Sequence, residues 1–348
     1  MAYMAARKSP GGRRRASNVD VSDEVLVPTA VQQALFPLDE LGPSARRARS
    51  LPFRSELTIE RASLFLSNEY EGESFVRETV IPSLDGRGDI IHRLSLGLVH
   101  SDDRERGVLR QHHQDVLYKL LQLWARQGHP VADIGGKAYG HIRTTAYALV
   151  RAIYPGNDSS RTYRRVLELL QDLQSVPVVL ETVYTWQDES FERQGFTILA
   201  NVSWTERGVD KKGVPRKGTE STVTILLSKQ VTQGFLRRQY KVMLGATYDS
   251  LCSGGKGRRS EIARLLYPFL DEQLEEQPEY AATLTELAQR FGLKQYLHAS
   301  KRREKFAPAV RALDETEIHA GRHRLRVQLE EIAEPRDVLL VARRIPNA

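Results

Sequence analysis

The sequence predicts an α+β fold in which one short arrangement of elements occurs twice. The later occurrence begins with a short helical pattern over 283–291 and continues with a basic run over 300–310. Two β-rich stretches follow, 323–329 and 338–342, and a turn signal over 334–337 separates them. Helix, helix and hairpin in this order predict a winged helix, whose second helix can enter the DNA major groove.

Length and composition favour a chain with more than one domain and an anionic partner. The 348 residues can form two or three domains of ordinary size, and a net charge of +7 predicts attraction to nucleic acid or to an anionic membrane surface. No apolar run approaches the roughly 20 residues that span a bilayer, and the first residues contain no secretory signal. The single cysteine, Cys252, excludes a disulfide framework. We therefore expect a cytoplasmic protein without a membrane partner.

Residues 1–56 are predicted to form a basic, largely disordered N-terminal arm. Prolines interrupt this segment repeatedly, and it carries arginine clusters at 13–15 and 46–49. These clusters either keep the chain in solution or hold DNA phosphates without sequence specificity, and salt would weaken such a phosphate contact.

Residues 57–247 are predicted to form the first winged-helix domain, with a hairpin between 57 and 99 as its opening element. A helix over 111–126 follows, because apolar residues recur there at helical spacing before Gly128, His129 and Pro130. The later elements are a helix over 142–153, a helix opening at Asp158, Ser159 or Ser160, and strands over 178–184, 195–202 and 221–227.

The helix that opens near residue 159 presents three arginines on one face. Its apolar face holds Tyr163, Val166, Leu167, Leu170 and Leu173, and the opposite face holds Arg161, Arg164 and Arg165. Basic residues near the start of an exposed helix are typical of a helix that enters the groove. The open alternative is that this helix faces a partner subunit and that its charges are only solvated.

A basic loop between the last two strands is the predicted wing of the first domain. It carries Lys211, Lys212, Arg216 and Lys217 among glycines and a proline. Such a loop at the tip of a hairpin is suited to DNA contact. A solvated turn with lysines for solubility is the alternative.

A linker over 248–259 is predicted to connect this domain to a second winged-helix domain at 260–348. The linker contains Gly254, Gly255 and Gly257 among basic residues, and a helix over 261–274 opens the second domain. The DNA-binding residues predicted there are Ser300, Lys301, Arg302, Arg303 and Lys305. Pro308 is expected to bend or end their helix, because an interior proline costs about 3 kcal/mol.

No catalytic residue, metal site or cofactor is predicted. Residues 250–257 do not match an ATP-binding loop. Ser250 occupies the position of the first glycine and Gly257 the position of the hydroxyl residue. His112 and His113 point in different directions on a helix, so we expect an exposed pair and not a metal site. His319-Ala320-Gly321-Arg322 matches an element of tyrosine recombinases, but the last tyrosine, Tyr296, lies upstream of it.

Two segments resemble plasmid replication initiators. The run from Lys301 to Leu313 resembles the recognition-helix region of iteron-binding initiators. Asp115-Val116-Leu117 and Gly135-Gly136-Lys137-Ala138-Tyr139 resemble the replication initiator protein A group, and together the resemblance covers about residues 57–345. It implies two winged-helix domains that bind origin repeats in double-stranded DNA and promote opening of an adjacent AT-rich region.

The expected function is therefore initiation of plasmid or secondary-replicon replication, by a protein associated with the nucleoid or plasmid. The resemblance implies host replication proteins such as a helicase as partners, and it allows a homodimer. A winged-helix repressor of its own promoter is the main alternative. A DNA strand-processing enzyme is a further one, because a catalytic triad spread through a fold leaves no sequence motif.

Overall fold

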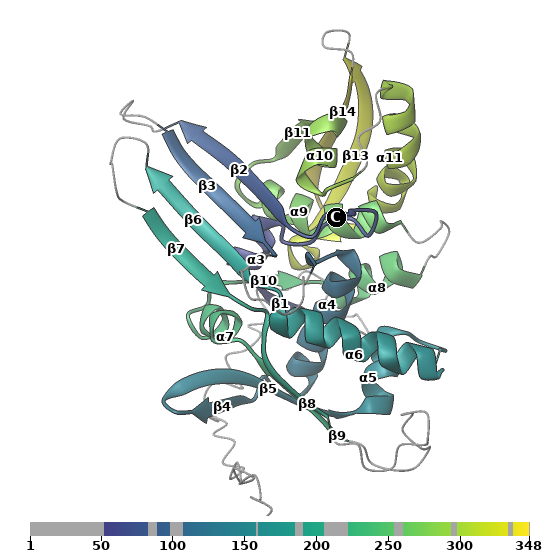
Figure 1. Ribbon diagram of the computed structural model, residues 1–348. Coiled ribbons are helices and arrows are strands. Elements are labelled where there is room, and N and C mark those ends of the chain that lie inside the picture. The colour runs from purple at the N-terminus through teal and green to yellow at the C-terminus, as the bar shows by residue number, and fades with distance from the viewer. Residues whose placement is uncertain are drawn as a thin grey trace, which may run out of the picture.

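The computed structural model describes residues 52–82, 89–97, 107–157, 159–184, 191–204, 222–253, 260–293, 298–332 and 337–347. Helices and strands are mixed throughout this part of the chain, as expected for an α+β protein (Figure 1). Among the described residues, no helix is both long enough and apolar enough to cross a membrane. The predicted arm as far as residue 51 and the four basic residues of the predicted wing lie outside the described residues.

One order of elements occurs twice along the chain. In the first unit it is helix α4 (Gln111–Arg126), strand β5 (Lys137–Thr145), helices α5 (Ala146–Ile153) and α6 (Ser160–Ser175), and strands β8 (Leu199–Trp204) and β9 (Thr222–Leu227). In the second unit it is helix α9 (Glu261–Glu276), strand β11 (Glu279–Thr283), helices α10 (Leu284–Arg290) and α11 (Ala299–Leu313), and strands β13 (His323–Ile332) and β14 (Asp337–Pro346).

The strand order is also the same in the two units. The first sheet runs β4-β5-β9-β8 and the second β11-β14-β13-β12, where β4 is Val131–Ile134 and β12 is Glu317–Ile318. In each sheet the last strand of the unit therefore lies between the other two shared strands. All described pairs in both sheets are antiparallel.

A third sheet, β2-β3-β6-β7, lies at the upper left in Figure 1, to the left of the second unit. Its strands β2 (Phe75–Pro82) and β3 (Asp89–Leu96) precede α4, whereas β6 (Val178–Tyr184) and β7 (Phe191–Phe196) are inserted between α6 and β8. An ion-pair row crosses one face: Arg93 lies 2.7 Å from Glu78 and 3.3 Å from Glu181, and Arg193 lies 3.2 Å from Glu181. Val76 and Val80 of the edge strand β2 are exposed.

The remaining elements join the two units. Strand β1 (Phe53–Glu56) pairs with β10 (Tyr240–Met243), and the other connecting helices are α3 (Leu57–Ala62), α7 (Lys229–Leu236), α8 (Gly245–Ser253) and the 3-10 turn η2 (His319–Gly321). Buried apolar residues of both units form one cluster, in which Leu117 and Leu121 of α4 occur together with Leu265 and Leu266 of α9.

Local sequence signals explain where several of the helices begin. The side-chain oxygen of Ser159 accepts a hydrogen bond from the amide of Thr162 and caps α6, as predicted for one of three candidate positions. Thr283 and Glu286 form a capping box at the start of α10. Helix α4 has the predicted bounds, and the predicted apolar face of α6 is buried except for the half-buried Leu167.

The structure corrects one helix prediction and decides part of another. The first four residues of the predicted helix 142–153 belong to β5, and Thr145 caps α5 by accepting from the amide of Ala148. β-branched Ile142, Thr144 and Thr145 favour a strand, and this segment pairs with β9. Pro308 does not end α11, because that helix continues to Leu313. Pro308 is exposed, so its ring points away from the packed side of the helix.

Three other segments differ from the prediction. The predicted opening hairpin is preceded by α3, and its strands begin only at Phe75. The predicted strand 195–202 is divided between β7 and β8. Residues 248–253 of the predicted linker lie in α8, where Tyr248 is fully buried, and residues 254–259 lie outside the described residues.

Candidate nucleic-acid interface

The first candidate surface is the α6 basic face, which consists of Arg161, Arg164 and Arg165. Helix α6 buries Tyr163, Val166 and Leu170, and this places all three arginines on its exposed side. They line an open hollow of about 750 Å³ together with Ser160 and Glu168. Among the described residues, Arg161 and Arg164 make no hydrogen bond or ion pair. The predicted arginines therefore share one accessible surface.

Arg165 differs from the other two arginines because two side chains hold its guanidinium. Its Nη2 lies 3.0 Å from Nε2 of His112 on α4, and its Nη1 lies 3.4 Å from Oε2 of Glu168. The arginine remains partly exposed. Its position is thus restricted while it still borders the hollow.

The second candidate surface is the α11 basic face, which consists of Ser300, Lys301, Arg302, Arg303 and Lys305. Ser300 and Arg303 line an open hollow of about 620 Å³ between α11 and the tip of the β13–β14 hairpin. This surface has more acidic partners than the α6 basic face, where Glu168 pairs with Arg165. Lys301 Nζ lies 2.8 Å from Oε2 of Glu304, Arg303 pairs with Glu331 of β13, and Lys305 pairs with Glu69.

Arg302 is mostly buried against the hairpin. Its Nε donates to Oδ1 of Asp337 at 2.9 Å, and the two side chains are only 11% and 8% exposed. Arg303, the next residue, is 51% exposed. Arg302 therefore links α11 to β14. Arg303 is exposed enough to contact a ligand.

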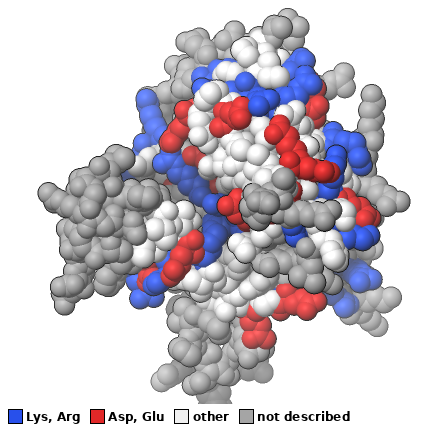
Figure 2. Space-filling view, turned by 90° about the horizontal axis from the view of Figure 1, so that it is seen from above, with Lys and Arg blue, Asp and Glu red and all other residues white. Residues whose placement is uncertain are grey.

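Charges of both signs lie close together near the second unit. Figure 2 looks down on the molecule from the top of Figure 1 and shows basic and acidic side chains next to one another over the described part of this face. Arg326 Nη2 lies 2.5 Å from Glu315 and Arg343 Nε 2.5 Å from Glu279, so ion pairs continue along β13 and β14. The acidic residues reduce the net charge that α11 presents to a polyanion.

The predicted exposed pair of histidines is wrong for His113, which is 2% exposed. Its Nδ1 accepts a hydrogen bond from the amide of Arg110 at 2.8 Å, and its Nε2 lies 3.0 Å from Oδ2 of Asp172 on α6. A nitrogen that accepts carries no proton, so Nε2 is the protonated one and donates to Asp172. Helical periodicity could not predict this bond, because its partner lies 59 residues away.

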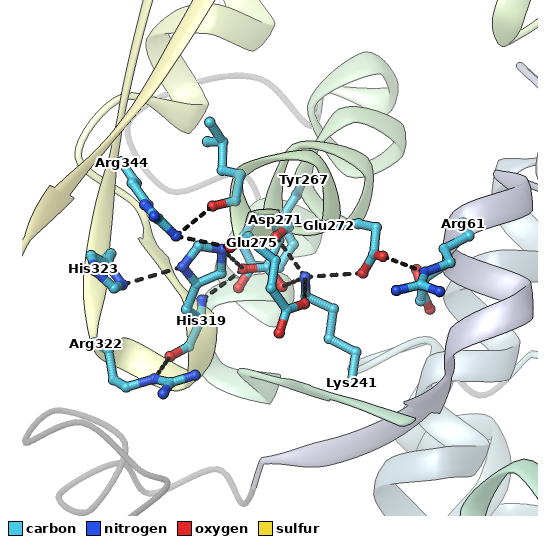
Figure 3. A network of polar contacts seen from close by, with 12 residues as sticks. Arg61, Lys241, Tyr267, Asp271, Glu272, Glu275, His319, Arg322, His323 and Arg344 are labelled. Carbon is cyan, nitrogen blue, oxygen red and sulfur yellow. Dashed lines mark hydrogen bonds and ion pairs between the residues drawn. The ribbon is translucent and has the colours of Figure 1, made fainter. Parts of the chain in front are cut away.

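A buried ion-pair network fixes the second unit against β10 and α3, two of the elements that join the units (Figure 3). Lys241 of β10 lies 3.3 Å from Asp271, 3.2 Å from Glu272 and 3.0 Å from Glu275, all on α9. Burial alone would lower the pKa of Lys241, but these three carboxylates outweigh it and raise the pKa. Arg61 of α3 adds a bond to Glu272 at 2.8 Å.

A second contact joins the first helices of the two units. Asp115 on α4 pairs with Arg264 on α9 and also accepts from the hydroxyl of Tyr248 at 2.7 Å. These contacts and the shared apolar cluster hold α6 and α11 in a defined relation. In Figure 1 both helices lie on the right-hand side of the molecule, opposite the third sheet.

Comparison with known proteins yields a likeness of fold. No protein-family model matches this sequence, and no curated protein is a significant relative. A crystal structure of selenomethionine derivatives of domains 2 and 3 of RctB matches with a TM-score of 0.51 at 10% identity, over 81% of this chain and 95% of that one. A structure of RctB domains 2–3, residues 155–483, matches with a TM-score of 0.47 at 10% identity, over 82% and 96%.

The arrangement found in this chain therefore also occurs in domains 2 and 3 of RctB. The structural similarity covers most of both chains, so it extends over both units. Sequence reasoning missed the residues that hold the basic side chains, namely His112, Asp337, Glu331 and Glu69. All come from elements other than the helix they contact, and periodicity carries no information about such pairs.

Proposed function

We propose that this chain is a sequence-specific double-stranded DNA-binding protein that initiates plasmid or secondary-replicon replication. One observation carries the proposal: two units share element order and strand order, and each carries basic residues on the exposed side of its third helix. Helix, strand, two helices and a strand pair is the order of a winged helix. The repeated order favours two such domains in tandem.

The structural similarity to RctB also supports this proposal. RctB is a replication initiator, and its domains 2 and 3 have the fold of this chain. A protein with two DNA-facing helices in fixed relation is suited to repeated sites at an origin, because one molecule can contact two successive grooves.

The residues of the two basic faces would differ in whether they contact bases or phosphates. Arginine can pair with both acceptors of guanine, whereas lysine more often holds phosphate as a point charge. Arg303 and one arginine of the α6 basic face are the candidates for base contact. Lys301, Lys305, Ser300 and the other arginines of the α6 basic face are the candidates for phosphate contact. The predicted wing residues at 211–217 would add phosphate contacts, and Arg302 would hold α11 in place.

Origin opening would then rest on binding energy and DNA deformation, with the helicase supplied by the host. We propose no catalytic step for this chain. A homodimer is part of the proposal, and the exposed valines on the edge strand β2 are the observation that favours it.

A plasmid maintenance assay tests this function. The gene and its flanking DNA are placed on a plasmid that lacks another origin, and transformants are counted. Wild-type protein should sustain the plasmid, and Arg161→Ala/Arg164→Ala should not. Arg237→Ala is the control, because Arg237 is exposed at the end of α7, outside both basic faces. If the wild-type gene cannot sustain replication, the initiator role fails and repression of its own promoter becomes the remaining DNA-binding function.

A further inference from the structure

Arg165 is the only member of the α6 basic face that a side chain from another described element holds. Its Nη2 lies 3.0 Å from Nε2 of His112, at the start of α4. Arginine nitrogens carry only donors, so Nε2 of His112 must be the acceptor and the imidazole must be neutral, with its proton on Nδ1.

His112 is itself held firmly. Its backbone amide donates to Oδ1 of Asn68 at 3.2 Å, and its ring centroid lies 4.3 Å from that of His113. His113 in turn bonds to Asp172 on α6. Burial, the neighbouring His113 and the charge of Arg165 lower the pKa of His112 to about 2, so the imidazole remains an acceptor at neutral pH.

The nature of the partner distinguishes Arg165 from Arg302. Arg302 is paired with a carboxylate in a nearly buried position, so its charge is cancelled and its guanidinium is occupied. His112 restricts Arg165 without cancelling its charge, and Glu168 is an exposed partner on the same helix. Arg161 and Arg164 have no such restraint among the described residues.

We propose that Arg165 is the base-reading arginine of the first unit and that His112 is its positioning residue. This inference rests on the proposed DNA-binding function and names a specificity determinant within it. A guanidinium held beside the groove loses less side-chain entropy when it pairs with the two acceptors of guanine. Arg161 and Arg164, which are free to follow the backbone, contact phosphates.

The test measures binding to two duplexes of equal length. One is selected from a random pool by the wild-type protein, and the other is a scrambled version of it. The variants are Arg165→Ala, His112→Phe, which keeps a ring but removes the acceptor, and His112→Gln, whose side-chain oxygen can still accept. His92→Phe is the matched control, because His92 is an exposed histidine on β3, in the third sheet. Thermal unfolding of each variant reports changes in the fold.

Arg165→Ala should weaken binding to the selected duplex by about 10- to 100-fold, and His112→Phe by about 2- to 10-fold. His112 is neutral, so His112→Phe should leave binding to the scrambled duplex and the salt dependence unchanged. His112→Gln should restore most of the affinity. In the Arg165→Ala background, His112→Phe should have no further effect.

The inference is overturned if His112→Phe binds both duplexes as the wild type does, or weakens both to the same extent. It is also overturned if His112→Phe still weakens binding when Arg165 is absent, because His112 would then act through the fold. These outcomes differ from failure of the proposed function itself, in which the wild-type protein selects no sequence and binds both duplexes equally.

Discussion

At the scale of single residues, adjacent arginines on α11 have different roles. Arg302 is nearly buried against Asp337, whereas Arg303 is half exposed and pairs with the exposed Glu331. An ion pair between exposed groups contributes little, but removal of one partner from a desolvated pair leaves the other unpaired. Position along the helix therefore decides whether an arginine stabilises the protein or is available to DNA.

Replacement of these two residues by alanine should separate stability from binding. Arg302→Ala should lower the free energy of unfolding by about 1 to 3 kcal/mol, because Asp337 loses its partner. Arg303→Ala should change it by no more than about 0.5 kcal/mol and should weaken DNA binding. Urea denaturation and a DNA titration measure the two effects. Equal losses of stability in both variants would contradict these assignments.

Glu60 is a second residue whose environment gives a testable effect. It is buried beneath Tyr118, whose hydroxyl lies 2.9 and 2.8 Å from its two carboxyl oxygens. Burial raises the pKa of Glu60 from 4.5 to about 7, although the hydrogen bond from Tyr118 opposes the shift. The folded protein therefore holds a proton between these values that the unfolded chain has lost, and stability falls as the pH rises through this range.

Glu60→Gln, which cannot ionise, should be more stable than the wild type at pH 8. The difference should be on the order of 3 kcal/mol and should shrink towards pH 5, where the wild-type carboxyl is mostly protonated. Urea denaturation at several pH values measures it. Glu71→Gln is the control, because Glu71 is exposed, and it should show no such gap. A gap that grows as the pH falls would be inconsistent with a raised pKa.

At the scale of elements, α6 and α11 occupy the same place in their units but differ in charge. The α6 basic face has one acidic neighbour, Glu168, whereas acidic residues of several elements surround the α11 basic face. Phosphate attraction should therefore come mainly from α6, and the contribution of α11 should depend more on its fit in the groove.

Salt dependence tests this difference between the helices. Each phosphate contact that is lost should reduce the slope of log affinity against log salt by about 0.9. Arg161→Ala/Arg164→Ala should show a reduction of this size for each arginine, and Lys301→Ala should show less because Glu304 already neutralises Lys301. Titrations at several salt concentrations measure the slopes. A larger change for Lys301→Ala would reverse the assignment.

Element prediction from the sequence succeeded where the signal is local. The spacing of Leu117, Leu120 and Leu121 and the break at Gly128 predicted the bounds of α4, and the short helical pattern over 283–291 predicted α10. Strand 142–145 was missed because its partner, β9, lies about 80 residues away and an Ala-rich helix follows directly. The third sheet pairs β3 with β6 over a similar separation, and no periodicity reveals that pairing.

The candidate site was predictable in its residues but not in its contacts. The helical wheel placed Arg161, Arg164 and Arg165 on an exposed face, as the structure confirms. The same method could not separate Arg302 from Arg303, because the burial of Arg302 depends on Asp337 of a distant strand.

At the scale of the whole molecule, the two units are joined by buried charge as well as by a common apolar cluster. Lys241 is almost inaccessible and faces three carboxylates of α9, and Asp115 joins α4 to α9 through Arg264. A junction of this kind favours a fixed spacing between α6 and α11 over free movement of two domains.

Unfolding should therefore occur in one transition for both units. Lys241→Met removes the cation from a cluster of carboxylates and should lower the free energy of unfolding by about 3 to 5 kcal/mol. Exposed Lys229→Met is the control, and it should have little effect. Calorimetry measures both. Two separate transitions in the wild-type protein would mean that the units unfold independently.

Hydroxyl-radical footprinting on a duplex selected by the wild-type protein tests the central claim most directly. If α6 and α11 of one molecule bind the same duplex together, that molecule should protect two segments whose centres lie about 10 base pairs apart. Arg161→Ala/Arg164→Ala should remove protection from one segment, and Arg303→Ala should weaken it at the other. One protected segment, equally sensitive to both variants, or no protection at all would contradict the account.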